Sequence, residues 1–225
     1  MTPWILIERV ETPGGPRLDL MRRGNEFSIL ANGAVLMTSH VHGSEQALAK
    51  LGLEALPAAS QERASVLVGG LGCGYTLAEA LARLGPGAAV TVAEITPAVV
   101  RWNRGVLGEL GGKPLEDPRV SVLETDICAL FRARTHTFHA ILLDVDNGPR
   151  AVAHAANGWL YTPAGLAAMR ASLAPAGVLA IWSAGPELGF SERLHAAGFT
   201  VEEHRPKARD GGARKRHWIW VARAP

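Results

Sequence analysis

The sequence has few of the features that mark secreted, membrane-spanning or metal-binding proteins. Its 225 residues include only two cysteines, Cys73 and Cys128, and each lies in an apolar segment with the pattern of a strand or helix. Such cysteines suit a reducing compartment and offer no zinc-binding spacing, so we predict a cytoplasmic protein without a bound metal. No apolar run reaches the roughly 18 residues of a membrane span, and the N-terminal segment lacks the basic and apolar regions of a signal peptide.

An excess of charge of one sign is also missing. The chain has 23 Lys and Arg residues and 21 Asp and Glu residues, which gives a net charge of +2. This balance is too mild to imply nucleic-acid binding by itself. The basic segment 204–217 is the exception, and we interpret it as a solvated hairpin loop; the alternative is contact with an anionic substrate or an RNA backbone. We therefore expect no nucleic-acid partner and no membrane partner.

The first forty residues predict a small antiparallel sheet. Four segments with strand patterns, at 4–12, 17–23, 26–30 and 34–39, are separated by turn signals that include Asn32-Gly33. Apolar residues then recur at helical spacing over 44–56. Because a polar, proline-marked segment follows, we predict an N-terminal unit at 1–60 and a cofactor-binding catalytic unit at 61–225.

The larger unit alternates between strand and helix patterns. Predicted strands lie at 65–70, 89–95, 120–125, 139–145 and 177–183, with helical segments between them. Near-continuous apolar strands of this kind predict a parallel sheet covered on both faces. The last two predicted strands, 199–204 and 216–224, have no helix between them and should pair as a hairpin. This α/β, Rossmann-like arrangement, a mostly parallel sheet ending in an antiparallel hairpin, resembles the fold of class I methyltransferases.

A glycine-rich turn connects the first of these strands to a helix in "VLVGGLGCGYTLAEAL". Gly70, Gly72 and Gly74 form G-x-G-x-G, whereas a dinucleotide site would place its third glycine where Tyr75 stands. No lysine followed by Ser or Thr is present, so the turn is not a P-loop. Glycines here let the backbone approach a ligand closely, and the helix N-terminus favours a negative group such as a carboxylate. A tight turn needed only for packing is the alternative.

Two acids follow the next strands of the predicted sheet. Glu94 ends the second strand, where an acidic side chain can bind both ribose hydroxyls of a nucleoside. Asp126, after the third strand, is placed to contact the adenine edge, although it can equally cap the helix that follows. We assign the adjacent Ile95 and Ile127 to the same site. An adenosine site without a diphosphate grip points to S-adenosylmethionine or a relative of it.

Five segments together resemble the spermidine synthase family of aminopropyltransferases over residues 26–182: "VLVGGLGCGYTLAEAL", "VAEITPAVVRWNR", "DPRVSVLETDI", "FHAILLDVDNGP" and "LYTPAGLAAMRASLAPAGVL". The resemblance implies a methyltransferase-like fold that uses S-adenosylmethionine or its decarboxylated form, often as a homodimer. It also implies roles for four residues. Glu94 would bind the ribose and Asp126 the adenine, Asp144 would deprotonate or orient the attacking amine, and Tyr161 would lie beside that amine.

The sequence departs from this family where the family carries acids. Cys73 stands where the family has an aspartate that binds the aminopropyl ammonium, and Asn147 stands where it has a second aspartate after Asp144. A thiol cannot supply the missing charge, so the decarboxylated cofactor would lose its ammonium partner. Losing that acid also removes repulsion against the carboxylate of intact S-adenosylmethionine.

Asp144 and Asp146 are the predicted acid pair of the active site. They flank Val145 and would share one face of a strand end, so both could reach a ligand at this sheet edge. Two close carboxylates can share a proton, which raises one pKa toward the range of a general base. The alternative is that one of the two acids only caps the loop that follows.

Combining these patterns, we predict methyl transfer from S-adenosylmethionine to a small acceptor, an amine. Aminopropyl transfer from the decarboxylated cofactor is the alternative that the resemblance alone implies. A non-catalytic adenosyl-binding module and an RNA-directed methyltransferase are two further alternatives. His40 and His42 share a face of a predicted loop, but no cluster nearby completes a metal site, so we interpret them as loop histidines.

Overall fold

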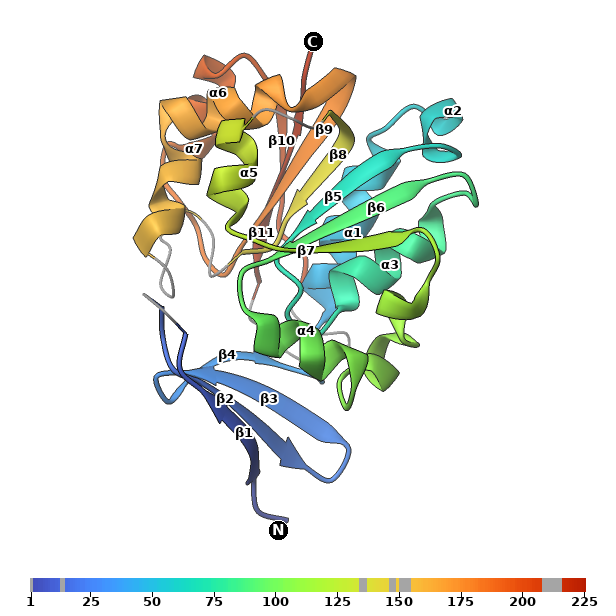
Figure 1. Cartoon of the computed structure of the whole chain (residues 1–225). Helices are drawn as coiled ribbons and strands as arrows, with labels where there is room; N and C mark the ends of the chain where they lie inside the picture. The colour runs from blue at the N-terminus through green and yellow to red at the C-terminus, as the bar shows by residue number, and fades with distance from the viewer. Residues whose placement is uncertain (1, 13–14, 134–136, 146–148, 150–154, 208–215) are drawn as a thin grey trace.

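The computed structural model describes residues 2–12, 15–133, 137–145, 149, 155–207 and 216–225. Two sheets divide the chain, and the smaller lies below the larger in Figure 1. The smaller sheet is the predicted meander, with strands in the order β1-β2-β3-β4 and every neighbouring pair antiparallel. Its strands are β1 (Ile5–Val10), β2 (Leu18–Arg23), β3 (Glu26–Ala31) and β4 (Ala34–Thr38).

The larger sheet has seven strands in the order β10-β11-β9-β8-β5-β6-β7. Strands β7, β6, β5, β8 and β9 run parallel, whereas β11 is antiparallel to both of its neighbours, β9 and β10. The predicted mostly parallel sheet with a terminal antiparallel hairpin is therefore confirmed. The strands are β5 (Ser65–Gly69), β6 (Ala89–Glu94), β7 (Val120–Glu124), β8 (Phe138–Leu143), β9 (Leu173–Ser183), β10 (Thr200–His204) and β11 (Trp218–Arg223).

Helices cover both faces of the larger sheet (Figure 1). One face carries α1 (Gly43–Glu54), α3 (Tyr75–Arg83) and α4 (Pro97–Arg104), and the other carries α5 (Ile127–Ala133), α6 (Pro163–Ala171) and α7 (Phe190–Ala196). Because successive strand side chains point to opposite faces, Val66 and Val68 join one core cluster and Leu67 joins the other. Because helices cover both faces of the sheet, the sequences of its parallel strands are almost continuously apolar.

Short helices complete the chain: α2 (Ala58–Gln61), η1 (Gly108–Gly111), η2 (Pro114–Glu116) and η3 (Ala155–Tyr161). Among the described residues, none of the helices has the length and apolarity that a membrane crossing needs.

Two elements differ from the expected organisation. Helix α1, which we assigned to the N-terminal unit, packs against α3 and against β8, β9 and β11 of the larger sheet. Helix α1 thus contacts the larger sheet, and the division of the chain near residue 60 stays a prediction. Helix α7 was not predicted, because its short polar sequence has only two buried anchors, Phe190 and Leu194, one helical turn apart.

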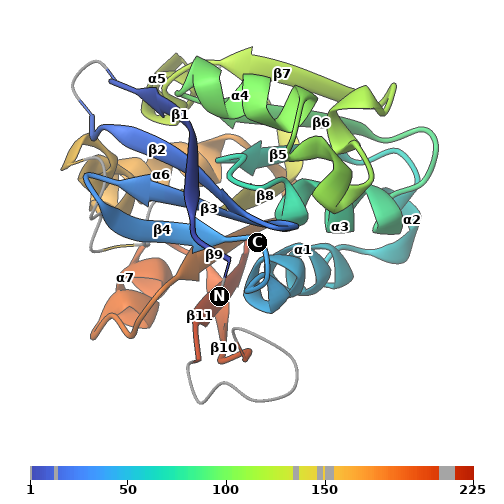
Figure 2. The ribbon, with the colours of Figure 1, turned by 90° about the horizontal axis from the view of Figure 1, so that it is seen from below.

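The smaller sheet lies across the ends of the larger one when viewed from below (Figure 2). Glu8 of β1 ties the two parts together. Its carboxylate accepts a hydrogen bond from Trp102 Nε1 at 2.7 Å and pairs with the Arg101 guanidinium, both on α4. Trp102 is thus buried in a structural contact between the two units.

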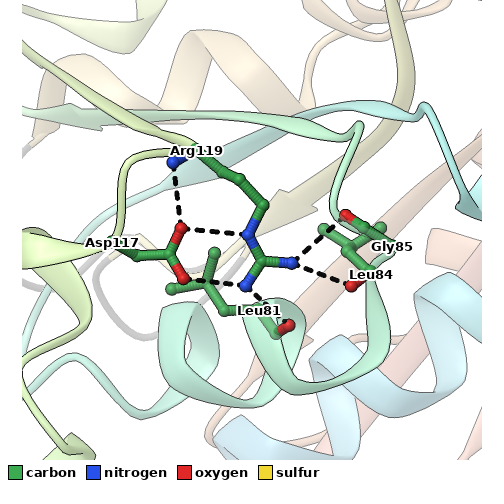
Figure 3. Close-up of polar contacts among 5 residues, drawn as sticks. All are labelled: Leu81, Leu84, Gly85, Asp117 and Arg119. Carbon is green, nitrogen blue, oxygen red and sulfur yellow. Dashed lines mark hydrogen bonds and ion pairs between the residues drawn. The ribbon is translucent and has the colours of Figure 1, made fainter.

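Arg119 anchors the far end of α3, the helix that begins at the glycine turn (Figure 3). Its guanidinium forms a two-point ion pair with Asp117 and donates to the carbonyl oxygens of Leu81, Leu84 and Gly85. Carbonyl groups at a helix C-terminus lack partners within the helix, and a cation there is favourable. Arg119 therefore fixes α3 against the start of β7.

We expect Arg119→Ala to lower the free energy of unfolding by about 2 kcal/mol, because it removes charge-assisted bonds to several otherwise unsatisfied acceptors. Urea unfolding followed by circular dichroism measures this. Arg83→Ala is the matched control on the same helix, since Arg83 makes surface ion pairs with Glu79 and Glu54, and it should cost less than about 0.5 kcal/mol. Equal losses for the two variants would contradict the anchoring role.

Candidate functional site

A cavity opens between the carboxyl ends of the parallel strands and the smaller sheet. It holds about 950 Å³ of space, including the part that is open to solvent. Open α/β sheets bind ligands at this edge, where strand order reverses between β5 and β8. The predicted site residues that line it are Gly70, Gly72, Glu94, Ile95, Asp126, Ile127 and Asp144.

The glycine turn is held by its neighbours on both sides. Gly70 has φ +87°, and a Cβ atom there would lie 2.2 Å from the carbonyl oxygen of Asp144, so no larger residue fits. Asn103 of α4 donates from Nδ2 to the carbonyl oxygen of Gly72 at 2.8 Å. Gly74, also at positive φ, is the N-cap of α3 and does not line the cavity. The turn is therefore a rigid wall of the cavity.

Glu94 presents a carboxylate in a fixed position at the end of β6. Its Oε2 accepts a hydrogen bond from the Leu71 amide at 3.0 Å, and its Oε1 accepts one from the Thr96 amide at 2.8 Å. Each carboxylate oxygen can accept a second hydrogen bond. Because the side chain is buried and lines the cavity, it can receive two hydroxyl donors from a ligand.

Asp126 makes the capping contact that the sequence left open, and its contact with adenine stays a prediction. Its Oδ1 accepts a hydrogen bond from the Cys128 amide at 2.8 Å, which caps the start of α5, and the residue also lines the cavity. Asn157 of η3 lines the same cavity, and sequence reasoning missed it.

Asp144, just beyond the end of β8, has a raised pKa. Thr76 Oγ1 donates to its Oδ2 at 2.6 Å. Burial raises the pKa of Asp144 to about 6, and the hydrogen bond from Thr76 opposes part of that rise. Its predicted partner, Asp146, lies outside the described residues.

Glu45 supplies a second carboxylate that sequence reasoning missed. It lies in the first turn of α1, is only 8% exposed and lines the cavity. Burial and the nearby charge of Asp144 raise the pKa of Glu45 to about 7, against the opposing hydrogen bond from Ser44. Two buried acids with raised pKa values can hold a cation or take a proton from a bound amine.

Cys73 lies in the core and does not line the cavity. Burial, with added repulsion from Glu45 and Asp144, raises the pKa of this thiol to about 12, so it stays neutral at neutral pH. Neighbouring Tyr75 donates from its hydroxyl to the carbonyl oxygen of Ser39 at 2.6 Å. Its ring stacks on His42 at 4.1 Å between centroids.

Tyr161 occupies a different place from the one that the resemblance implied. It is 3% exposed and packs edge-on against Phe190 within the core between the larger sheet and α5, α6 and α7. It does not line the cavity, because η3 turns its ring toward this core. Across the described ranges of the chain, no three His, Cys, Asp or Glu side chains gather as metal ligands.

Comparisons with known proteins relate the chain to solved structures. No family model matches the sequence, and no curated protein matches it significantly. Spermidine synthase from Thermotoga maritima matches with a TM-score of 0.77 over 98% of this chain and 73% of that chain, at 17% identity. A spermidine synthase in complex with the transition-state analogue AdoDATO gives 0.78 over 98% and 74%, at 18% identity.

Methyltransferases match over a smaller part of the chain. Human methyltransferase-like protein 13 in complex with SAH gives a TM-score of 0.60 over 81% of this chain and 82% of that chain, at 18% identity. Precorrin-6y C5,15-methyltransferase from Geobacter metallireducens gives 0.56 over 79% and 87%, at 16% identity. The chain therefore has the Rossmann-like fold that spermidine synthases and class I methyltransferases share.

We expect Glu45→Gln to stabilise the protein above neutral pH. A carboxyl group whose pKa is raised on folding favours the folded state below its unfolded pKa of about 4.5, and this contribution is lost as pH rises to about 7. The variant should therefore gain up to roughly 3 kcal/mol of unfolding free energy at pH 8 and little at pH 5.

Urea unfolding at the two pH values measures this difference. Glu124→Gln is the control, because Glu124 is exposed at the end of β7, and it should shift the unfolding free energy by less than about 0.5 kcal/mol at either pH. A gain from Glu45→Gln that is the same at pH 5 and pH 8 would show that Glu45 is ordinarily ionised.

Proposed function

We propose that the chain is an S-adenosylmethionine-dependent transferase that moves a methyl group to a small amine acceptor. The observation that carries this proposal is that two groups of residues line the same cavity. A fixed ribose-type acid, Glu94, and the glycine turn form one part of that lining, and the buried acids Glu45 and Asp144 form another.

The cofactor part of the cavity fits an adenosyl group. Glu94 is fixed by amide donors of Leu71 and Thr96 and lines the cavity where ribose hydroxyls would bind, and Asp126 follows the next strand at the same edge. The turn carries no P-loop lysine, so it lacks the cation that would bind a diphosphate. Two structures of the same fold were solved with AdoDATO and with SAH, which supports an adenosylmethionine-type ligand.

The acid pair would prepare the acceptor. S-adenosylmethionine, when bound, supplies a methyl group on a sulfonium, which is an activated leaving group. Asp144 and Glu45 would hold the acceptor amine by charge-assisted hydrogen bonds, and one of them would take the proton that the amine loses before its nitrogen can attack. Their raised pKa values, about 6 and about 7, suit this exchange at neutral pH. Positioning would provide the rest of the acceleration.

The lining of the cavity favours a small acceptor over a polyamine. The acids among the described lining residues are Glu45, Glu94, Asp126 and Asp144, and two of these are assigned to the nucleoside. The smaller sheet adds only apolar lining: Pro16, Leu18, Ile29, Leu36 and Met37. A polyamine carries several positive charges and would need more carboxylates than the remaining two.

Aminopropyl transfer from decarboxylated S-adenosylmethionine is the second candidate. Cys73 cannot bind the aminopropyl ammonium, but Glu45 approaches the same region from α1, since its charge acts on both Cys73 and Asp144. Glu45 could therefore replace the acid that the sequence lacks at position 73.

Calorimetric titration with each cofactor form tests the proposal. We expect intact S-adenosylmethionine to bind more tightly than the decarboxylated form, and Glu94→Gln to weaken its binding by at least about tenfold, because a charged acceptor of two hydroxyl bonds is lost. Glu79→Gln, on the surface of α3, is the control and should bind like wild type. Preference for the decarboxylated form would replace methyl transfer by aminopropyl transfer, and binding of neither would reject both.

We also propose a homodimer. Strand β1 is an edge strand of the smaller sheet, and its side chains Ile5, Leu6 and Ile7 are 58%, 43% and 45% exposed. Exposed apolar edge strands tend to pair with another chain. A second copy that covers β1 would bury this surface.

Light scattering after size exclusion should give a mass near twice the 23.8 kDa of one chain. The double variant Ile5→Lys/Ile7→Lys should reduce the mass to that of one chain, whereas Val35→Lys at the opposite edge strand, β4, should not. A wild-type protein with the mass of one chain at about 100 μM would reject the homodimer.

A further inference from the structure

The carboxylate of Glu45 continues into a buried chain of hydrogen bonds. Ser44 Oγ donates to Glu45 Oε2 at 2.6 Å, and the same Oγ lies 2.7 Å from His217 Nδ1. Ser44 is 0% exposed and His217 is 5% exposed. His217 directly precedes β11, so residues 173 positions apart meet behind the cavity wall.

Both separations are hydrogen-bond distances, so the chain is complete when two protons lie along it, the state reached once Glu45 has taken up a proton; His217 Nε2 keeps its own proton throughout. In one arrangement, Ser44 donates to an ionised Glu45 and His217 Nδ1–H donates to Ser44. In the other, a protonated Glu45 donates to Ser44, and Ser44 donates to the bare Nδ1 of His217. The heavy atoms occupy the same positions in both, so a proton can pass between Glu45 and His217 without any movement of the chain.

The surroundings of Glu45 contain few other groups that change charge near neutral pH. Helix α1 packs against α3, β8, β9 and β11. The titratable groups that face Glu45 from these elements and from the glycine turn are Tyr75, Cys73, Asp144 and His217. Burial raises the pKa of both Tyr75 and Cys73 to about 12, so they remain protonated. Of these described neighbours, Asp144 acts on Glu45 through its charge, and His217 is the one joined to Glu45 by hydrogen bonds through Ser44.

The His217 ring is also held in place. It packs edge-on against Trp182, which lines the cavity, with 4.8 Å between ring centroids. Its backbone amide donates to the carbonyl oxygen of Pro206 at 3.1 Å. A ring fixed in this way keeps Nδ1 directed at Ser44 while the proton moves.

We propose that Ser44 and His217 act as a proton relay for Glu45, which is the base that deprotonates the amine acceptor. Before the step Glu45 is a carboxylate and His217 is neutral, with its proton on Nε2 and none on Nδ1. The N–H bond of the acceptor then breaks, its electron pair stays on the nitrogen, and its proton moves to Glu45. Glu45 then passes a proton to Ser44 while Ser44 passes its own to His217, so Glu45 returns to a carboxylate and His217 becomes an imidazolium. No electrons are lost or gained. The proposal rests on the proposed function, because it takes the acceptor to be an amine bound at Glu45.

Nuclear magnetic resonance of the unliganded protein tests whether the proton is shared. With ¹³C-labelled Glu and His, the Glu45 carboxyl and the His217 ring should follow one common titration step in wild type. In Ser44→Ala the two signals should separate into independent steps. Ser191→Ala is the control: it removes a hydroxyl that accepts a hydrogen bond from Trp220 Nε1, and it should leave the common step unchanged. Independent steps in wild type would overturn the relay.

His217→Asn separates a relay from a structural contact. The Asn amide can keep a hydrogen bond to Ser44 but cannot take up a proton. With S-adenosylmethionine and an amine acceptor that wild type methylates, we expect kcat to fall about tenfold or more, the acid limb of the pH profile to move to lower pH, and the KM for the cofactor to stay unchanged.

A pH profile of His217→Asn that matches wild type would overturn the relay while leaving the transferase in place. Failure of wild type to bind S-adenosylmethionine in the calorimetric titration would instead reject the proposed function. The magnetic resonance titration needs neither cofactor nor acceptor, so it decides on proton sharing independently of that result.

Discussion

The close approach of β5 and β8 at the glycine turn is the constraint on which the rest of the site depends. Gly70 leaves β5 with its Cα against the carbonyl of Asp144, the Asp144 amide donates to Gly69 O at 2.8 Å, and the Gly70 amide donates to Ala93 O at 2.9 Å. Three strand ends are thereby fixed together. The side chains that follow them, Glu94 and Asp144, face one cavity because the backbone between them has no room to vary.

The two buried acids lower the stability of the fold and serve the proposed reaction. Glu45 and Asp144 lie close together in a poorly solvated wall of the cavity, so ionising either one costs free energy. A pair of apolar side chains at these positions would carry no such cost. Natural proteins keep such arrangements mainly where a ligand or a reaction uses them. Arg119 and the two covered faces of the sheet stabilise the fold elsewhere, so α3 and its glycine turn stay fixed although the cavity wall carries these acids.

The sheet and the acids at its edge could be predicted from the sequence because both depend on local order, whereas the roles of these acids stay predictions. Glu94, Asp126 and Asp144 each follow a strand, and parallel strands bring their carboxyl ends to one edge. Glu45 lies 99 residues before Asp144, and only the packing of α1 on the larger sheet brings the two together, so no spacing rule could find it. The core position of Tyr161 could not be read from the sequence for a related reason: the phase of a short 3-10 turn decides which core its ring enters.

The attachment of the smaller sheet has a kinetic consequence. This sheet supplies one wall of the cavity, and Glu8 joins its outermost strand to α4 through Trp102 and Arg101. The cavity is partly open to solvent, and the wall that the smaller sheet forms is joined to α4, the helix that follows Glu94. For a ligand whose release requires this wall to move, the dissociation rate would depend on the contacts of Glu8 with Trp102 and Arg101, separately from the strength of its contacts inside the cavity.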